Sequence, residues 1–466
     1  MYSDFPDSSS LVSLPVTKFL SNIQNNSILF VAYSGGLDST VLLHSIYHNQ
    51  IRLKKNLRIM AVYIDHGLQE ESALWSKHCD DFCRDKDIDF IGLKVVVEST
   101  SRKGVEAEAR RLRYQAFLKT IDDFAKNTWL GNIYLLTGHH QRDQAETVLL
   151  NLFRGSGVNG LAGMPADRTL ITDSGVLVSH VRPMLNTSYD DIVEYAHYHS
   201  LPFVTDKTNI QTEFKRNAVR HNVLPILEAS WPKAIDALSK TAQHMQEALV
   251  LLDGYAEEFL KTVDDSAYFI ELQDFSEVSW VKQKNNIRYW FKLHWPQIVL
   301  SDVHYQWIEK SFTNYHKSQN HNYRYQLPEG SLRFYQNRLY YFIHEPRLFS
   351  VQIASIADLN MNPSLEGEGM FFDINRVDGL SNMTVRSVLP TDNLQKKALK
   401  RFFQHNKIPK WERSVWPVLE VDGVVISVLG CIDCLSGLAG KSIEVNQANA
   451  VRVDYNQLLK WWGVFN

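Results

Sequence analysis

From residue 28 to about 205, the chain alternates short runs of β-branched and apolar residues with polar stretches of helical length. Three of the apolar runs are ILFVAY (28–33), LRIMAVYID (57–65) and NIYLLTGHH (132–140). Strands that are separated by helices are joined by crossovers, which makes neighbouring strands parallel. We therefore predict an α/β domain with a parallel sheet over residues 1–225.

The rest of the chain has a different pattern. Helical periodicity with many aromatic residues, as in 234–260, predicts a mainly helical middle domain over 226–345 that ends in a short β-like segment. Residues 346–380 include a stretch rich in Asn, Pro, Gly and Ser, which is typical of a linker. We expect a small α+β domain over 381–466.

The charge balance of the whole chain differs from that of one short segment. The 466 residues are 44% hydrophobic and 22% charged, which argues against a disordered protein, and the net charge is only −3. Residues 384–413 nevertheless hold eight basic side chains against two acidic ones. On the helix expected there, an apolar stripe would leave one basic face exposed, formed by Lys396, Lys397, Lys400 and Arg401. Such a face suits RNA phosphates, although a solvated helix face is the common alternative.

The same composition sets expectations about location and metal content. No apolar run approaches the roughly 18 residues of a membrane span, and the first residues lack a basic start followed by an apolar core. We expect a cytoplasmic protein without a membrane partner, either a monomer or a homodimer. The four cysteines offer no four-ligand set, so neither zinc nor an iron–sulfur cluster is expected, and the thiols should be buried and inert.

The run ILFVAY leads directly into a glycine turn and then a helix, at Ser34, Gly35, Gly36, Leu37, Asp38, Ser39 and Thr40. Two glycines let backbone N–H groups approach an anion closely, and a helix N-terminus favours negative charge. A carboxylate beside phosphates needs a cation between them, so Asp38 is a candidate Mg²⁺ ligand. The alternative is an ordinary strand–helix turn.

This loop resembles that of the PP-loop ATP pyrophosphatases, which have an adenine nucleotide α-hydrolase-like fold. Within that superfamily, further segments resemble the tRNA(Ile)-lysidine synthetases: VYIDHGLQ (62–69), GVEAEARRLRYQAFL (104–118), the runs 137–164 and 206–227, and KRFFQHNKIPKWERSVWPVL (400–419). The resemblance implies a ligase that uses ATP to attach L-lysine to C2 of the wobble cytidine of a CAU-anticodon tRNA(Ile). The tRNA is first adenylated, and AMP and pyrophosphate are released.

The resemblance also assigns roles to residues. It places ATP at the glycine loop and near Asp65 and His66, and Mg²⁺ at Asp38 and Asp143. His139 would contact a phosphate or the nucleotide, Asp143 would position either the metal or the amine, and Glu146 would bind the lysine ammonium. These last three share one helix face if that helix begins near His139; a histidine cap before a solvated acidic face is the alternative.

Arginines complete the implied site. Arg113 would stabilise charge on the α-phosphate, since a guanidinium offers a fork of donors to phosphate oxygens. Binding of tRNA or lysine is expected at Arg110, Arg154, Arg216 and Arg220 and at the basic face of 396–401. A helix-surface pair is the alternative for Arg216 and Arg220. The sequence departs from the family at Arg142, where the family commonly has an aspartate.

Two other functions share the glycine loop. A PP-loop tRNA thiolation enzyme is the rival enzyme, against which the cysteine set counts. An RNA-binding module with a vestigial nucleotide site is the non-enzymatic alternative, and the intact Asp38 beside intact glycines argues against it.

Overall fold

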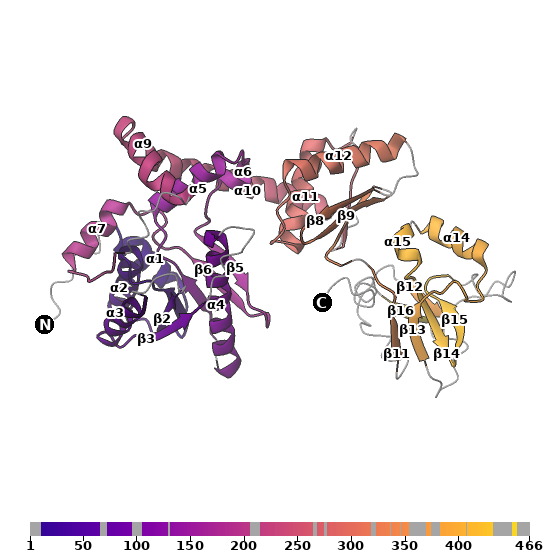
Figure 1. The fold of residues 1–466 in the computed structure, drawn as a ribbon, viewed down its shortest axis with the longest axis horizontal. Helices are drawn as coiled ribbons and strands as arrows, with labels where there is room; N and C mark the ends of the chain where they lie inside the picture. The colour runs from indigo at the N-terminus through magenta and orange to yellow at the C-terminus, as the bar shows by residue number, and fades with distance from the viewer. Residues whose placement is uncertain are drawn as a thin grey trace. The chain divides into compact units, whose positions relative to one another are not determined.

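The structure is a computed structural model (Figure 1), which divides into two compact units, residues 1–251 and 252–466. Each unit is described by itself. The described residues are 11–65, 72–95, 105–128, 131–205, 215–263, 268–274, 277–317, 323–335, 337–344, 346–353, 370–373, 383–406, 408–431 and 450–453.

The first unit is built on a six-stranded sheet in the order β3-β2-β1-β4-β6-β5. The strands are β1 (Ile28–Ala32), β2 (Arg58–Asp65), β3 (Asp89–Lys94), β4 (Ile133–Leu136), β5 (Asp167–Ile171) and β6 (Leu177–Val181). Every pairing is parallel except β5 with β6. The predicted parallel α/β domain is confirmed.

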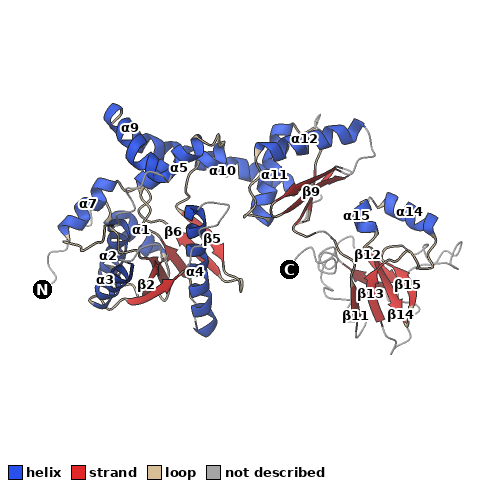
Figure 2. Cartoon of the chain, in the orientation of Figure 1, coloured by secondary structure: helices blue, strands red, loops and turns tan. Residues whose placement is uncertain are grey.

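Helices cover both faces of this sheet (Figure 2). These helices are α1 (Ser13–Asn22), α2 (Leu37–Arg52), α3 (Ser72–Arg84), α4 (Val105–Thr128) and α7 (Tyr189–Tyr198), whereas α5 (Gln141–Leu152) and α6 (Val158–Leu161) follow β4 in the chain. Residues of α1, α2, α3 and α7 form one core with β1 and β2, and Phe117 and Ile121 of α4 form the other with β1, β4 and β6. Because the crossovers return every parallel strand in the same direction, the carboxyl ends of β1, β2, β4 and β6 meet at one edge.

A helical segment follows the sheet in the chain. It comprises α8 (Lys215–Ala218), a π-helical turn η2 (Val219–Val223), α9 (Leu224–Ser230) and the long α10 (Ala234–Leu260). Val219 and Leu224 pack with Ala145 and Leu149 of α5 in a small apolar cluster. This cluster fixes η2 against the helix that begins at the carboxyl edge of the sheet.

The second unit contains the rest of α10, α11 (Trp280–His294) and α12 (Asp302–Lys317). These helices pack on an antiparallel sheet of order β7-β10-β9-β8. Its strands are β7 (Phe269–Glu271), β8 (Tyr323–Leu327), β9 (Gly330–Tyr335) and β10 (Arg338–Phe342). The helical middle region is confirmed, and the β-like segment expected at 331–343 is the centre of this larger sheet.

A second antiparallel sheet, β11-β13-β14-β15, carries α14 (Lys396–His405) and α15 (Lys410–Arg413). Its strands are β11 (Ser350–Ile353), β13 (Met383–Ser387), β14 (Pro417–Val421) and β15 (Val424–Val428), and β12 (Met370–Asp373) pairs with β16 (Ala450–Val453). Ser350 pairs with Arg386, so the linker predicted over 346–380 needs correction at its start, where a β-forming segment joins the sheet. The other domain boundaries stay predictions.

Candidate functional site

The glycine turn after β1 is held in shape by its own side chains. Gly35 has a φ of +76°, in the left-handed region that favours glycine. A Cβ there would lie 2.8 Å from the sulfur of Cys79, so the turn also packs too closely on α3 for a side chain. The Ser39 hydroxyl accepts from the Ser34 N–H at 3.2 Å and donates to the Gly36 carbonyl at 3.0 Å. The turn is therefore formed before any ligand binds.

The first turn of α2 lies at the carboxyl edge of the sheet, and its N-terminus is not capped. Gly36 is the N-cap residue, and it has no side chain that could cap the helix. The first N–H groups of a helix have no partner within the helix, so here they are available to an anion. The predicted anion site has the required backbone geometry.

Asp38 lies in this first turn, where the helix dipole favours its charge. Its side chain is 41% exposed, but its Oδ1 is buried and has no hydrogen-bond partner in the described part of the chain. Burial raises the pKa of Asp38, and the charges of Asp143 and Glu146 raise it further. An unpartnered carboxylate oxygen beside a glycine turn and a helix N-terminus fits a Mg²⁺ ligand, because Mg²⁺ takes one or two carboxylates and completes its shell with phosphate and water oxygens.

The end of β4 lies directly against α2. A Cβ on Gly138 would lie 2.9 Å from the Asp38 carbonyl oxygen and 3.2 Å from the Ser39 nitrogen, so only glycine fits there. This contact brings His140 Nε2 to 3.7 Å from Asp38 Oδ1. The carboxyl ends of β1 and β4 thus form one site.

The helix after β4 begins two residues later than the sequence suggested. α5 starts at Gln141, and His140 is its N-cap in a capping box with Asp143, whose Oδ2 accepts from the His140 N–H at 3.0 Å. His139 therefore precedes the helix and does not share a helix face with Asp143 and Glu146, which corrects that expectation. The capping histidine that was weighed as the alternative is His140.

A buried cluster of two acids and two arginines joins α5 to α8 and η2. Arg216 donates from Nε to Glu146 at 2.8 Å and from an Nη to Asp143 Oδ1 at 2.9 Å. Arg220 makes the same pair of contacts, at 2.5 Å to Glu146 and 3.0 Å to Asp143. Glu146 is 0% exposed, and its two oxygens both accept from these guanidinium groups.

The charges in this acid–arginine cluster balance. Burial acts to raise the pKa of Asp143, but the positive charges around it, led by His140 and Arg216, hold it well below its usual range. Burial likewise disfavours the charged form of Arg220, whereas its bonds to Glu146 raise its pKa. Arg216 and Arg220 are therefore not the surface pair considered as an alternative. Their proposed contact with tRNA or lysine remains a prediction.

A chain of hydrogen bonds fixes the proton on His139. Burial, with the charge of Arg182 next, lowers the pKa of His180 to about 2, and its Nδ1 accepts from Arg168 Nε at 3.2 Å. The proton of neutral His180 is thus on Nε2, which lies 3.1 Å from the Thr137 hydroxyl. That hydroxyl lies 2.9 Å from His139 Nδ1 and donates to it. Burial lowers the pKa of His139 to about 3, so His139 is neutral and carries its proton on Nε2.

The remaining predicted residues of this unit lie on α4, at the end of β2 and after α5. Arg113 and Arg110 are exposed on α4, and the Arg110 guanidinium lies 5.3 Å from the ring centre of Tyr114. Asp65 ends β2, and Arg154 is exposed just after α5. His66 lies outside the described residues.

The basic face predicted on 396–401 belongs to the second unit. Lys396, Lys397, Lys400 and Arg401 are all exposed on α14. Ala398 and Phe403 are buried on its other side, as the apolar stripe predicted. The basic residues in the first turn add their charge to the positive end of the helix dipole, which strengthens the attraction of this surface for anions.

Sequence reasoning missed several residues at the edge. Arg168, His180 and Arg182 lie beside Arg110 and Thr137, and no role was predicted for them. Arg142, the departure from the family pattern, forms an ion pair with Glu228 at 2.8 Å and so helps to hold α9. The alternation of Val178, His180 and Arg182 along one strand was the available signal, because alternate residues point to one face.

The cysteines and metal ligands agree only partly with expectation. Cys79 and Cys83 are free and buried, and burial raises the pKa of each to about 12, so they are inert as predicted. Cys431 is disulfide-bonded, which corrects the expectation of a free thiol there. Within the described ranges, no group of three or more His, Cys, Asp or Glu is arranged to hold a metal ion.

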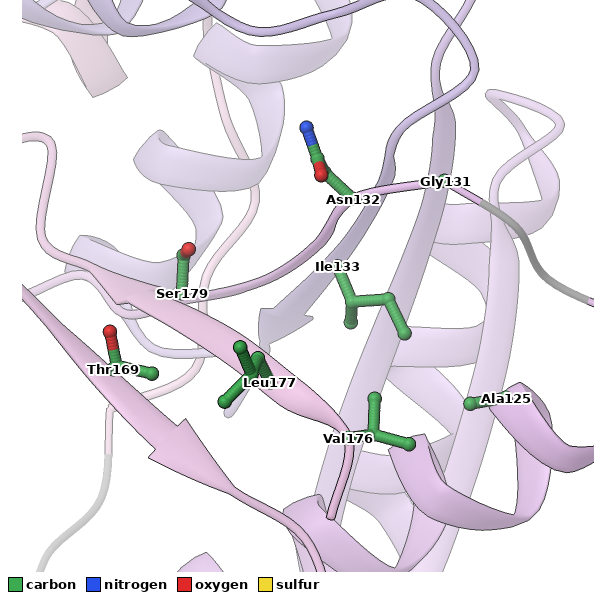
Figure 3. Close-up of a pocket in the computed structure, with 8 residues that line it drawn as sticks. All are labelled: Ala125, Gly131, Asn132, Ile133, Thr169, Val176, Leu177 and Ser179. Carbon is green, nitrogen blue, oxygen red and sulfur yellow. The ribbon is translucent and has the colours of Figure 1, made fainter. Parts of the chain in front are cut away.

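A surface pocket lies at the opposite edge of the same sheet (Figure 3). Ile133 and Leu177, the first residues of β4 and β6, line it together with Ala125 and Val176. None of the predicted site residues contributes to it. The pocket therefore lies at the amino ends of these parallel strands, whereas the candidate site lies at their carboxyl ends.

Comparison with known proteins identifies the family. A family model described as the PP-loop domain matches residues 10–227, and one described as the TilS substrate C-terminal domain matches 386–442. The tRNA(Ile)-lysidine synthase of Hydrogenovibrio crunogenus is 36% identical over 90% of this chain and 97% of its own length. The chain belongs to the tRNA(Ile)-lysidine synthase family. A second member, from Coxiella burnetii, is 32% identical over 92% of this chain and 94% of its own.

Membership of this family confirms three predictions: the family itself, the PP-loop fold of the first unit, and an ATP-using ligase. It favours the synthase over the thiolation enzyme. A solved U34-tRNA thiolase from Methanococcus maripaludis is 17% identical, with a TM-score of 0.41 over 51% of this chain and 78% of its own. In the described part of the chain, no helix is both long and apolar enough to cross a membrane.

Proposed function

We propose that this protein attaches L-lysine to C2 of the wobble cytidine in a CAU-anticodon tRNA(Ile). ATP first adenylates the C2 oxygen with loss of pyrophosphate, and the lysine amine then displaces AMP. One observation carries the proposal: the uncapped glycine turn and the acid–arginine cluster meet at the carboxyl ends of β1 and β4. The name of the matching relatives, tRNA(Ile)-lysidine synthase, supports tRNA(Ile) as a substrate.

The first step needs donors for the polyphosphate and for charge that builds on the α-phosphate. The N–H groups of the turn and of the first turn of α2 would bind the leaving pyrophosphate. His139 offers its Nε2–H as a neutral donor, and Arg113 adds a positive charge. Asp38, with its unpartnered Oδ1, would hold Mg²⁺, which when bound screens the repulsion between phosphate oxygens and the carboxylate.

The second step places an amine near the acids. Asp143 and Glu146 are the acids that the family resemblance implies, and in this structure their oxygens accept from Arg216 and Arg220. An ammonium that binds Glu146 must therefore displace one of these guanidinium groups. The basic face of α14, with Arg110 and Arg154, would bind tRNA phosphates.

The test is transfer of radiolabelled lysine to a CAU-anticodon tRNA(Ile) transcript in the presence of ATP. We expect one lysine, one AMP and one pyrophosphate per tRNA, and none with a transcript in which uridine replaces the wobble cytidine. A folded protein that binds ATP and this tRNA but never transfers lysine would overturn the proposal. Transfer to the uridine transcript would overturn the proposed base specificity.

A further inference from the structure

Arg182 is a buried cation without an acidic partner among the described residues. It is 3% exposed, follows the last residue of β6, and has an Nε with no hydrogen-bond partner in the part of the chain that the structure describes. Its other contacts are uncharged: Nη1 donates to the Pro165 carbonyl at 2.7 Å, Nη2 lies 3.4 Å from His180 Nδ1, and Tyr114 forms a hydrogen bond with it. Buried charges in proteins are normally paired or bind an ion.

Two more arginines converge on the same place. Arg168 lies opposite His180 in the β5–β6 pairing, so both side chains point to the face covered by α4. The guanidinium groups of Arg168 and Arg110 lie 5.4 and 5.3 Å from the ring centre of Tyr114 on α4. Burial lowers the pKa of Arg182, and the charges of Arg168 and Arg110 add to this effect. Three positive charges are thus held together, and within the described ranges no carboxylate forms an ion pair with any of them.

The other titratable groups described near this cluster are neutral or already paired. His180 is 0% exposed and uncharged, because burial lowers its pKa to about 2. The acids of the neighbouring cluster, Asp143 and Glu146, are already balanced by Arg216 and Arg220. The charge of the three arginines is left for a ligand.

The position of the cluster sets it apart from the glycine turn. β4 lies between β1, which carries the glycine turn, and β6. Strands are about 4.8 Å apart, so the end of β6 is roughly 10 Å from the turn. The cluster therefore faces a different phosphate group from those that the turn would bind. Arg168 and Arg110 are exposed, which suits the backbone of a large polyanion better than a small, enclosed one.

From this arrangement we infer that Arg110, Arg168 and Arg182 form a second anion site, which binds a backbone phosphate of the tRNA. The site rests on the proposed function, since it positions the same tRNA on the same sheet edge. Guanidinium forks bind phosphate through paired N–H donors, so the three groups also fix the direction of the strand that they hold.

The test uses Arg168→Gln and Arg182→Met in the full-length protein. Binding of the CAU-anticodon tRNA(Ile) transcript is measured over a salt series, ATP binding is measured without tRNA, and thermal melts are recorded for the free protein. Arg58→Gln is the matched control, because Arg58 is exposed at the opposite edge of the same sheet. We expect each test variant to weaken tRNA binding about tenfold and to lower the salt slope by about one, with ATP affinity unchanged.

Stability separates binding from a structural role. Removing an unpaired buried charge should leave the melting temperature of Arg182→Met equal to or above that of the wild type. A lower melting temperature with unchanged tRNA affinity would overturn the inference, as would loss of ATP affinity alone, which would assign the site to a nucleotide phosphate. Wild-type protein that binds tRNA and transfers no lysine would contradict the proposed function and not this site, whose readout is binding.

Discussion

Gly138 lies so close to Asp38 that a single methyl group would not fit between β4 and α2. Its Cβ would lie 2.9 Å from the Asp38 carbonyl oxygen, which belongs to the backbone and cannot rotate away. The contact sets the distance between the glycine turn and the residues that follow β4. The site is therefore assembled by backbone packing before any ligand is present.

Gly138→Ala should separate these two elements. We expect a loss of about 1 to 3 kcal/mol in unfolding free energy, the usual cost of overpacking, and at least a tenfold fall in the rate of pyrophosphate release. Gly254→Ala is the control, because a Cβ there meets nothing within 4 Å and Gly254 is inside α10. That change should stabilise by about 0.5 to 1 kcal/mol. Equal effects of the two variants on pyrophosphate release would contradict the role of the close contact.

Asp38→Asn should abolish pyrophosphate release and yet raise stability. Burial raises the pKa of Asp38 above its ordinary value of 3.8, so the folded protein binds this proton more tightly than the unfolded chain does. The protonated Asp38 carboxyl group therefore stabilises the fold at low pH, and this stabilisation is lost as the pH rises through the pKa of Asp38 in the folded protein. Thermal melts should show the variant above the wild type at pH 7, with the difference shrinking towards pH 4. A variant that melts below the wild type at pH 7 would refute this account.

The glycine turn and the sheet were predictable because their signals are local. The apolar run 28–33 and the glycines that follow it are continuous in the sequence, and strand alternation requires no knowledge of distant partners. The basic face of α14 follows from helical spacing alone. These features are decided within one or two elements.

The acid–arginine cluster was not predictable in the same way. Arg216 and Glu146 are 70 positions apart, and their contact depends on η2 packing against α5. The start of α5 was misplaced because His140 provides a cap, whereas Ser, Thr, Asp and Asn are the common cap residues. Arg182 was not predicted because its significance is the lack of an acidic partner among the described residues, which a sequence does not show.

Arg220→Met should test how strongly the cluster supports the fold. It leaves the fully buried Glu146 with one guanidinium, and breaking such a pair costs about 3 kcal/mol. The lowered pKa of Asp143 means that its charged form stabilises the fold at pH values above its ordinary pKa of 3.8, and that this stabilisation is lost as the pH falls. The difference in unfolding free energy between Arg220→Met and the wild type should therefore be full at pH 7 and should become smaller below about pH 4. Urea unfolding of the variant and the wild type at several pH values measures this difference in unfolding free energy.

The control for this experiment is Arg111→Met. Arg111 forms an exposed pair with Glu108 on α4, and such pairs contribute little to stability. The two variants should therefore differ clearly in urea midpoint. A similar, small effect for both would mean that water screens the acid–arginine cluster as it screens a surface pair.

Thr137→Val should allow the proton of neutral His139 to lie on either ring nitrogen. Without the hydroxyl, no group in the described part of the chain donates to His139 Nδ1, so both neutral tautomers become accessible. Nitrogen-15 spectra should show a single Nε2–H tautomer in the wild type and a mixture in the variant, with pyrophosphate release reduced about fivefold to tenfold. Thr120→Val is the control, since Thr120 bonds only within α4. A wild-type activity profile with a histidine step near pH 6.5 would contradict the lowered pKa of His139.

Lys397→Glu with Lys400→Glu should weaken tRNA binding without affecting ATP. Both side chains are exposed on α14, and each phosphate contact that is lost lowers the slope of log affinity against log salt by about 0.7 to 0.9. We expect a slope lower by between one and two and an affinity reduced at least tenfold at low salt. The charge-matched control is Lys18→Glu with Lys54→Glu, which are exposed on the first unit away from its carboxyl edge. If both double variants shift affinity equally and leave the slope unchanged, general charge repulsion accounts for the loss and the α14 face is not part of the tRNA interface.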